Sequence, residues 1–441
     1  MVANFKNLPK TSVQKIIMFP KYPGKAIVYL TLAITTLLFL LSKSSLHSLG
    51  TNIFVSIAQL TALLGTVLFA FSFILAARTY LIEEAFGGLD RAYRVHHKTG
   101  VWSFGLLAAH FISVLIGYGI NKLPVATLMF NGRAFIVGEI ALAVMAIIIL
   151  TIIFAKVKYQ YFVIIQKFFA IPFAFGIFHL LIVGSDISRY APLKLFMIVI
   201  VYLGALSWVY REFFYKTIGP SAEYTIDKVT NKGGDIFELS LSPVGKPLVP
   251  TFGQFAYFSF HSKNVPAEMH PFSFSSVSTD GKTSFAAKAL GDFTKILNRA
   301  ETGDRVTVYG PYGKFFADFD REENNIFIAG GIGITPFLSV LRGNNSCRNT
   351  QIFYTTKNEK DCVFLEELNK LSCDNTAFNC FFHDSERRGH LTADIVEKRA
   401  GGLDGKKIFL CGPGPMMKSI TAGLIAKGIP KENIIFEAFS Y

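Results

Sequence analysis

The chain has 441 residues, which is enough for about three domains of ordinary size. Hydrophobic residues make up 51% of it and charged residues 17%, whereas a typical soluble protein is about 25% charged. With a mean hydropathy of +0.40, the chain is not a single water-soluble globule, nor a disordered, collagen-like or disulfide-stapled protein. Much of the net charge of +13 lies beside apolar stretches, which is typical of a membrane protein and argues against nucleic-acid binding.

Six apolar stretches approach or exceed the length of about 20 residues that a helix needs to cross a bilayer. We expect these spans at residues 26–41, 53–77, 101–120, 134–155, 162–183 and 193–210. Lysine and arginine crowd the side of the bundle that carries the N-terminus and are sparse on the other side, so both termini are predicted to be cytoplasmic. The sequence therefore predicts a cytosolic segment at 1–25 and a six-helix bundle at 26–214, in a multi-pass protein of the cell membrane.

The second half of the chain has a different pattern. Residues 219–318 contain short alternating strands separated by glycine and proline, which predicts an antiparallel barrel. Residues 322–441 alternate apolar strands with helical stretches, which predicts a parallel α/β domain. All cysteines lie in this last part, without a CxxC pair, so zinc and ferredoxin-type clusters are disfavoured and a reducing, cytosolic location is favoured. They are Cys347, Cys362, Cys373, Cys380 and Cys411.

Three histidines lie in or beside the spans, where ionisable side chains are costly and are functional candidates by default. They are His96, His110 and His179. His96 and His110 are 14 residues apart, so on a helix they share one face about 21 Å apart. Imidazoles at two depths of a bundle suit the ligation of two stacked haems. A lone membrane histidine is more often bonded to a neighbouring helix, but three of them ahead of a flavin-type domain favour haem.

These residues also carry a family resemblance. Residues 88–97 followed by His110 resemble the third span of the NADPH oxidase and ferric reductase superfamily, and residues 178–181 resemble the end of its fifth span. The resemblance implies two b-type haems between these spans, with a fourth ligand 13 residues before His179. Gln166 occupies that position. Since an amide is a weak donor to iron, we expect one well-ligated haem rather than two.

The expected haem lies near the outer face, between His110 and His179, while His96 has no matching imidazole at the inner level. The inner site is then empty, or holds a haem with one imidazole, or another group carries the electron there. Pro172 lies between Gln166 and His179 and is expected to kink the fifth span.

Two motifs in the barrel region resemble flavin-binding motifs of the same superfamily. The first comprises His270, Pro271, Phe272, Ser273, Phe274, Ser275 and Ser276. The second comprises Lys288, Gly291, Asp292, Phe293 and Thr294. A flavin needs hydroxyls and backbone amides beside its reactive edge and apolar walls, and free N–H groups at a helix start suit its pyrophosphate. The resemblance implies FAD, with Ser273 near flavin N5.

The last domain carries two loops that resemble the nicotinamide-binding loops of ferredoxin reductases. The first contains Gly330, Gly331, Gly333, Thr335 and Pro336, between a predicted strand and a helix, and the second contains Cys411, Gly412 and Pro413. Glycines allow a backbone to approach a pyrophosphate closely. The resemblance implies that Cys411 and Glu437 lie near the nicotinamide and that Tyr441 covers the flavin. Taken alone, Cys411 is equally a buried strand-end thiol, and Tyr441 an exposed tail.

The choice between NADPH and NADH depends on charge. Lys357 follows a predicted strand where many relatives carry an arginine for the 2′-phosphate, and an ammonium group there, with Arg387 or Arg388, suits that phosphate. Glu359 is nearby, but no acidic residue stands at the strand end itself. We therefore favour NADPH and keep NADH as the alternative.

The predicted fold is a six-helix membrane bundle followed by a cytosolic ferredoxin-reductase-like module. The predicted function is transmembrane electron transfer from NAD(P)H through FAD and haem b to an outer acceptor, which is a ferric chelate, oxygen, a flavin, a quinone or a separate protein. Catalytic roles are expected for Ser273, Cys411, Glu437 and Tyr441. Two alternatives remain: a membrane-anchored flavin reductase without haem, and the haem subunit of a complex that reduces an extracytoplasmic partner.

Overall fold

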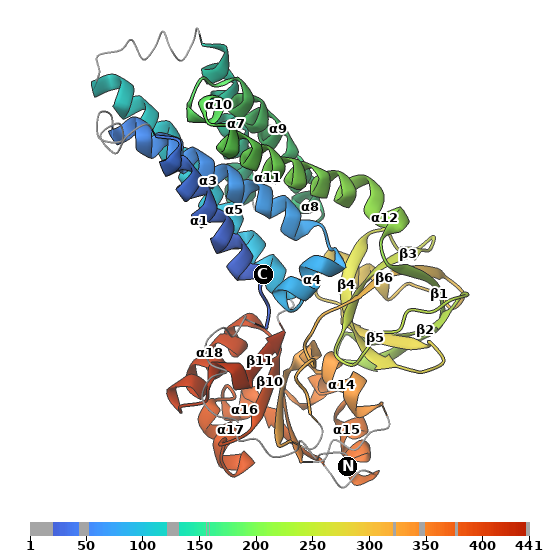
Figure 1. The fold of residues 1–441 in the computed structure, drawn as a ribbon. Helices are drawn as coiled ribbons and strands as arrows, with labels where there is room; N and C mark the ends of the chain where they lie inside the picture. Colours follow the sequence, from blue (N-terminus) through green and yellow to red (C-terminus); the bar gives the residue numbers. More distant parts are fainter. Residues whose placement is uncertain are drawn as a thin grey trace, which may run out of the picture. The chain divides into compact units, whose positions relative to one another are not determined.

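The computed structural model describes residues 21–43, 53–120, 132–155, 157, 159–320, 323–343, 349–374 and 378–437. The chain divides into two compact units, Met1–Tyr215 and Lys216–Tyr441 (Figure 1). Tyr441 lies outside the described residues.

The first unit is helical, as the apolar stretches predict. Its long helices are α1 (Gly24–Leu41), α3 (Ile53–Ala76), α5 (Leu89–Ile120), α7 (Arg133–Phe154), α9 (Ala170–Ile182) and α11 (Ala191–Val209). The shorter ones are α4 (Tyr80–Phe86), α8 (Tyr159–Lys167), α10 (Asp186–Arg189) and α12 (Tyr215–Ile218), with a π-helical turn at Tyr210–Phe214. Counting α8 with α9, the described residues form six helical segments long and apolar enough to cross a membrane, which confirms the predicted bundle. A helix satisfies its backbone groups internally, as a bilayer core requires.

The third and fifth spans differ from their predicted form. Helix α5 begins at Leu89, twelve residues before the predicted position 101, because charged side chains such as Asp90 and Arg94 pair one turn apart at 3.2 Å and continue the helix beyond its apolar part. The fifth span is broken rather than continuous: α8 ends at Lys167 and α9 begins at Ala170. Pro172 lies in the first turn of α9, where its missing N–H is tolerated.

The second unit begins with a closed antiparallel barrel of strand order β1-β2-β5-β4-β3-β6 (Figure 1). Its strands are β1 (Ser221–Gly233), β2 (Ile236–Pro243), β3 (Phe255–His261), β4 (Met269–Val277), β5 (Thr283–Lys288) and β6 (Arg305–Tyr312). Alternate side chains fill the barrel, among them the fully buried Leu239, Phe258 and Phe285. The short helix α13 (Asp292–Leu297) follows β5 and adds Phe293 and Leu297 to this core.

The unit ends with a parallel sheet of order β11-β10-β7-β8-β9. Its strands are β7 (Asn325–Gly330), β8 (Thr350–Thr356), β9 (Phe378–Asp384), β10 (Lys407–Cys411) and β11 (Ile434–Glu437). Its helices are α14 (Thr335–Leu341), α15 (Leu365–Asp374), α16 (Ser385–Arg388), α17 (Ala393–Ala400) and α18 (Gly414–Ala426).

Both faces of this sheet are covered. Phe327 and Phe409 pack with α14 and α15 on one face, and Ile326 and Ile408 pack with α17 and α18 on the other. Strands buried on both faces explain why the sequence shows continuous apolar runs instead of alternation. The barrel and this sheet confirm the predicted fold class.

Candidate functional sites

His110 and His179 face each other across the membrane unit. His110 lies on α5 and His179 on α9, and their ring centroids are 6.3 Å apart. The Nδ1 atom of His110 donates to the carbonyl of Ala58 at 2.8 Å, and that of His179 donates to the carbonyl of Ala134 at 2.7 Å. Because a carbonyl only accepts, Nδ1 carries a proton in both rings, and in a neutral imidazole the Nε2 atom then carries the lone pair that binds metals.

This geometry fits a metal between the two rings. Two imidazoles that bind one metal from opposite sides, each at about 2 Å, have centroids about 6 Å apart. Metal-ligating histidines usually donate their other ring nitrogen to a carbonyl or carboxylate, as both rings do here. Gly138 on α7 also makes room, since a Cβ on it would lie 2.9 Å from the His179 ring. The residues present therefore fit a bis-imidazole haem.

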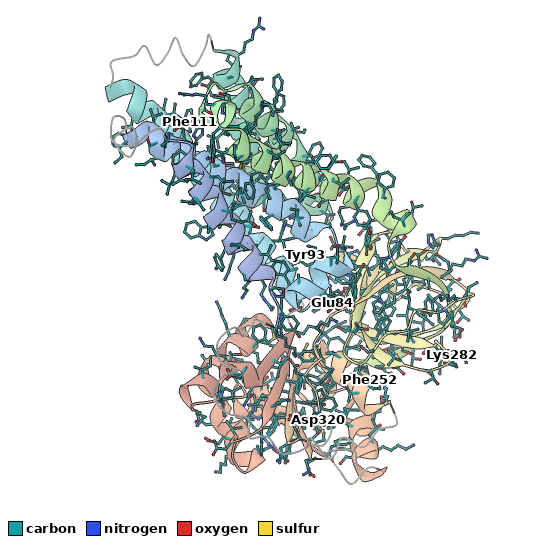
Figure 2. All side chains as sticks on the ribbon, viewed as in Figure 1. Glu84, Tyr93, Phe111, Phe252, Lys282 and Asp320 are labelled. Atoms are coloured by element: carbon teal, nitrogen blue, oxygen red, sulfur yellow. The ribbon has the colours of Figure 1, made fainter. Side chains whose placement is uncertain are left out.

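His96 has the same hydrogen bond but a different surrounding. Its Nδ1 atom donates to the carbonyl of Ser72 at 2.8 Å, and the ring of Tyr93, on the same helix, has its centroid 6.4 Å from that of His96. Figure 2 labels Tyr93 on the helical unit. In the described part of the bundle, His97 is exposed on the same helix, and Gln166 is exposed on α8. Among the residues that the structure describes, the level of His96 therefore lacks the second imidazole that a bis-imidazole haem needs.

The first flavin-type motif forms strand β4. Ser273 is buried, and its hydroxyl has no hydrogen-bond partner among the described residues, which fits a polar edge of a bound flavin. The ring of Phe272 stacks on Phe285 at 4.8 Å, while the Ser275 hydroxyl donates to Glu238 at 2.5 Å. Along the rest of this strand, Phe274 is buried, Ser276 is half-buried and Pro271 is exposed.

The second motif lies against the first. His270 stacks on Phe293 with ring centroids 3.6 Å apart and contacts Glu268 through Nε2 at 3.0 Å. Burial lowers the pKa of His270, although Glu268 opposes this shift. Gly291 precedes α13, where the Thr294 hydroxyl oxygen accepts the N–H groups of Leu290 and Gly291. Lys288 ends β5 and Asp292 begins α13, so the second motif lies at the end of β5, where Phe293 stacks on His270 at the start of β4.

The two nicotinamide-type loops meet at the carboxyl ends of β7 and β10. A Cβ on Gly333 would lie 2.5 Å from the carbonyl oxygen of Cys411, and one on Gly412 would lie 3.0 Å from Gly330. Glycine is therefore required at both positions for the loops to pack together. Gly331 has a φ of +56°, in the left-handed region.

This meeting point is also where the strand order of the sheet reverses, because β7 continues to β8 on one side and β10 to β11 on the other. Ligands of open α/β sheets bind outside the carboxyl ends of strands at such a point. Thr335 donates to the carbonyl of Ile332 at 2.7 Å, and Pro336 follows it in the first turn of α14. Pro413 caps the start of α18 on the other loop.

Cys411 and Glu437 are register partners on the adjacent strands β10 and β11, and both are buried. Burial, with a smaller contribution from Glu437, raises the pKa of the Cys411 thiol well above its usual value, so this cysteine stays protonated. A Cβ on Gly313 would lie 3.4 Å from the Glu437 carboxylate and 3.2 Å from the ring of Phe255. Since Phe255 pairs with Ser273, Gly313 links Glu437 to the flavin-type strand.

Lys357 is exposed directly after β8. Its carbonyl accepts the N–H of Glu386 at 2.9 Å, so the end of β8 lies beside the start of α16, which carries Arg387 and Arg388. Arg387 contacts Asp384 at 3.8 Å, and its side chain is 80% exposed. The structure therefore brings the predicted basic groups to one edge of the sheet.

The sequence did not predict an ion-pair network that joins the barrel to the parallel sheet. Arg342, which follows α14, bonds Glu238 on β2 and Glu367 on α15, and it donates to the carbonyl of Ser275 at 3.3 Å. Lys232 joins Glu238 at 3.1 Å. The sequence signal for this network is Glu238, an acidic residue within the largely buried strand β2. A buried carboxylate requires a positively charged or hydrogen-bonding partner.

Three family matches cover most of the chain. Residues 61–177 match the ferric reductase like transmembrane component, residues 221–315 match an FAD-binding domain, and residues 327–422 match an oxidoreductase NAD-binding domain.

Similar proteins match the second half. The reductase component of propane 2-monooxygenase from Rhodococcus jostii is 30% identical over 47% of this chain and 60% of its own length. Flavohemoprotein A from Dictyostelium discoideum is 33% identical over 32% of this chain and 36% of its own length. This chain thus spans less than two thirds of either relative.

Solved structures match the same part. The flavohem-like FAD/NAD binding domain of nitric oxide dioxygenase from Vibrio cholerae aligns over 50% of this chain and 99% of its own, with 20% identity and a TM-score of 0.42. A ferredoxin NADP+ reductase from Neisseria gonorrhoeae with bound FAD and NADP aligns over 49% of this chain and 98% of its own, with 16% identity and a TM-score of 0.43.

The ferric-reductase-like bundle, the FAD-binding domain and the NAD-binding domain follow one another in this order along the chain. By this architecture the chain belongs to the NADPH oxidase and ferric reductase superfamily.

Proposed function

We propose that the protein carries electrons from cytosolic NAD(P)H, through FAD and one b-type haem, to an acceptor on the outer face of the cell membrane. The observation that carries this proposal is the 6.3 Å separation of the His110 and His179 rings, with the Nδ1 atom of each ring donating to a backbone carbonyl. Bound FAD takes up a hydride and gives its electrons up singly, and a haem iron takes up one electron at a time.

The proposed cytoplasmic side of the bundle is inferred from the distribution of positive charge. Lysine and arginine flank the helix ends on the side that carries the N-terminus, including Lys25, Arg91 and Arg211. We propose the cytosolic segment at 1–25, the bundle at 26–214, the FAD domain at 219–318 and the NAD(P) domain at 322–441. The proposed acceptor is small, namely a ferric chelate, oxygen, a flavin or a quinone, or else it is a separate protein.

The residues of the second unit have proposed roles that follow from their chemistry. The Ser273 hydroxyl offers a hydrogen bond to the flavin edge, and His270 with Phe293 forms an aromatic wall beside it. Cys411 stays neutral, so it offers an uncharged surface to the nicotinamide and does not act as a base. The glycine loops after β7 and β10 bind the pyrophosphate of the nucleotide, and Lys357 favours NADPH through its charge.

Cofactor analysis of the detergent-purified full chain tests the proposal. We expect haem b and FAD together, and stopped-flow absorbance should show flavin reduction by NADPH or NADH. FAD without haem would favour a membrane-anchored flavin reductase. Haem that is reduced only in the presence of a further protein would favour a subunit of a larger complex. A flavin that stays oxidised with both nucleotides contradicts the proposal.

The terminal Tyr441 is proposed to cover the flavin until the nicotinamide displaces it. A chain that ends at Ser440 is then expected to bind the nicotinamide more tightly or to discriminate less between NADH and NADPH. Steady-state kinetics with both nucleotides measure this, and values equal to those of the full chain contradict the role of Tyr441.

A further inference from the structure

Four phenylalanine rings form a continuous cluster inside the membrane unit. Phe69 and Phe73 lie one turn apart on α3, with ring centroids 5.5 Å apart. Phe173 on α9 lies 5.0 Å from Phe69 and 4.8 Å from Phe73, and Phe169 lies 6.4 Å from Phe69. Phe69, Phe73 and Phe173 are buried. Each of these rings packs against another ring of the cluster, so van der Waals contacts stabilise the arrangement.

The cluster extends between the two histidine levels. Phe73 directly follows Ser72, whose carbonyl accepts the hydrogen bond from His96. Phe173 precedes His179 by six residues on the same helix, which is about 9 Å along the axis. The rings therefore begin at the level of His96 and end about 9 Å short of His179 along α9.

Helix α11 closes the cluster from a third side. A Cβ on Gly204 would lie 3.0 Å from Ala70 and 3.1 Å from the tip of the Phe173 ring. Rings in direct contact, with a helix backbone packed against them, leave no room for a flat macrocycle between α3 and α9 at this depth.

The hydrogen bond of His96 has a structural explanation that does not require haem. Helices α5 and α3 are joined by a ladder in which His96, Ser103 and His110 donate to the carbonyls of Ser72, Gly65 and Ala58. The donors are seven residues apart, which is close to two helical turns, and the middle donor is a serine. The ladder therefore packs α5 against α3, and the hydrogen bond of His96 does not by itself identify a haem ligand.

We infer that the phenylalanine cluster takes the place of a second haem and conducts electrons between the level of His96 and the His110–His179 site. This inference rests on the proposed function. One electron leaves the reduced flavin and one electron arrives at the His110–His179 site. The phenylalanine side chains are neither oxidised nor reduced, because they act only as a closely packed medium for transfer.

Haem stoichiometry is the first test. The pyridine haemochrome assay on the purified full chain should give one haem per polypeptide, and a redox titration should show a single one-electron wave. The His96→Ala variant should keep the full haem content and the same spectrum. Two haems per polypeptide, or loss of a haem in His96→Ala, overturns the inference while leaving the proposed function intact. A wild-type protein without haem defeats the proposed function itself.

The second test measures the rate of electron transfer through the phenylalanine cluster. Flash photoreduction of the flavin makes electron entry fast, and the rise of the reduced haem band reports transfer through the bundle. The Phe69→Leu/Phe173→Leu variant should transfer electrons at least several-fold more slowly than wild type. The matched control is Phe178→Leu, on the same α9 but 53% exposed, which should match wild type.

The haem content and spectrum of each variant show whether its bundle is intact. If the double variant loses haem, the single variants Phe73→Leu and Phe173→Leu provide the same comparison with a smaller disturbance. A transfer rate in haem-replete leucine variants equal to that of wild type and Phe178→Leu overturns the role of the cluster.

Discussion

Arg342 and Glu238 form a partly buried, two-pronged ion pair that joins the barrel to the parallel sheet. The two terminal nitrogens of Arg342 each donate to one oxygen of Glu238, and Arg342 also bonds Glu367 at 2.6 Å and 2.9 Å. Arg342 also donates to the carbonyl of Ser275. It therefore joins the end of α14, the helix after the first nicotinamide-type loop, to β4, the strand that carries the first flavin-type motif. Ser339, one turn earlier, accepts the N–H of Gly253 at 2.8 Å and strengthens this junction.

The variant Arg342→Met is expected to lower the free energy of unfolding of this unit by about 3 kcal/mol, since it removes the two-pronged partner of the buried Glu238 and leaves only Lys232 and the Ser275 hydroxyl beside it. Urea unfolding of the full chain, followed by flavin fluorescence, measures the change. The control is Arg387→Met, whose side chain is 80% exposed, and it should stay within about 0.5 kcal/mol of wild type. Equal midpoints for both variants would contradict a stabilising role for the junction.

Glu238 also predicts a pH dependence of stability. Burial alone would raise its pKa, but the hydrogen bonds and charge of Arg342 outweigh burial and lower the pKa below the ordinary value of 4.5. A group with a lowered folded pKa stabilises the protein above its unfolded pKa and loses that contribution as the pH falls through the folded pKa. Thermal unfolding carried from pH 7 to well below pH 4.5 should therefore show a steeper acid loss in wild type than in Glu238→Gln, and parallel curves would contradict this.

The haem-ligand assignment predicts a spectral loss. His110→Ala or His179→Ala removes one of two facing imidazoles, so the low-spin b-type spectrum should fall to background in each variant. The control His97→Ala changes an exposed ring on the same helix as His110 and should keep the spectrum. A full low-spin spectrum in the His110→Ala/His179→Ala double variant would show that the haem is held elsewhere.

Lys357 is expected to determine nucleotide preference. The variant Lys357→Glu replaces an ammonium group, which suits a 2′-phosphate, by a carboxylate, which is negative like the phosphate. The KM for NADPH should therefore rise about tenfold or more, while the KM for NADH changes little. Lys360→Glu alters another exposed lysine three residues away and serves as the control. Steady-state kinetics with both nucleotides decide the matter, and an equal change for NADPH and NADH would refute the assignment.

Cysteine reactivity offers a check on the second unit. Burial raises the pKa of Cys362 and Cys411, and raises that of Cys380 to about 11, whereas Cys373 is exposed. Because alkylation requires the thiolate and access, iodoacetamide at neutral pH should modify Cys373 far faster than these three. Peptide mass spectrometry measures this, and rapid modification of Cys411 in the folded protein would contradict its protonated, buried state.

Local patterns were sufficient for most of the fold. Apolar runs of helical length, alternating strands and continuous apolar strands each depend on neighbours within a few residues, so the six helices, the barrel and the parallel sheet follow from the sequence. The flavin-type and nicotinamide-type motifs are contiguous in the chain, and the structure brings the described residues of each to one place. The expectation of one well-ligated haem, which rests on Gln166, stays a prediction.

Tertiary structure decided the relationships between distant residues. The 6.3 Å approach of His110 to His179, the ladder between α3 and α5, and the contact of Phe173 with Phe69 and Phe73 all join helices whose periodicity specifies an apolar face but not its neighbour. Arg342 and Glu238 are 104 residues apart, and no local pattern pairs them. Periodicity reports which side of an element is buried, whereas the identity of the partner depends on side-chain packing across the whole unit, and only the folded chain determines that packing.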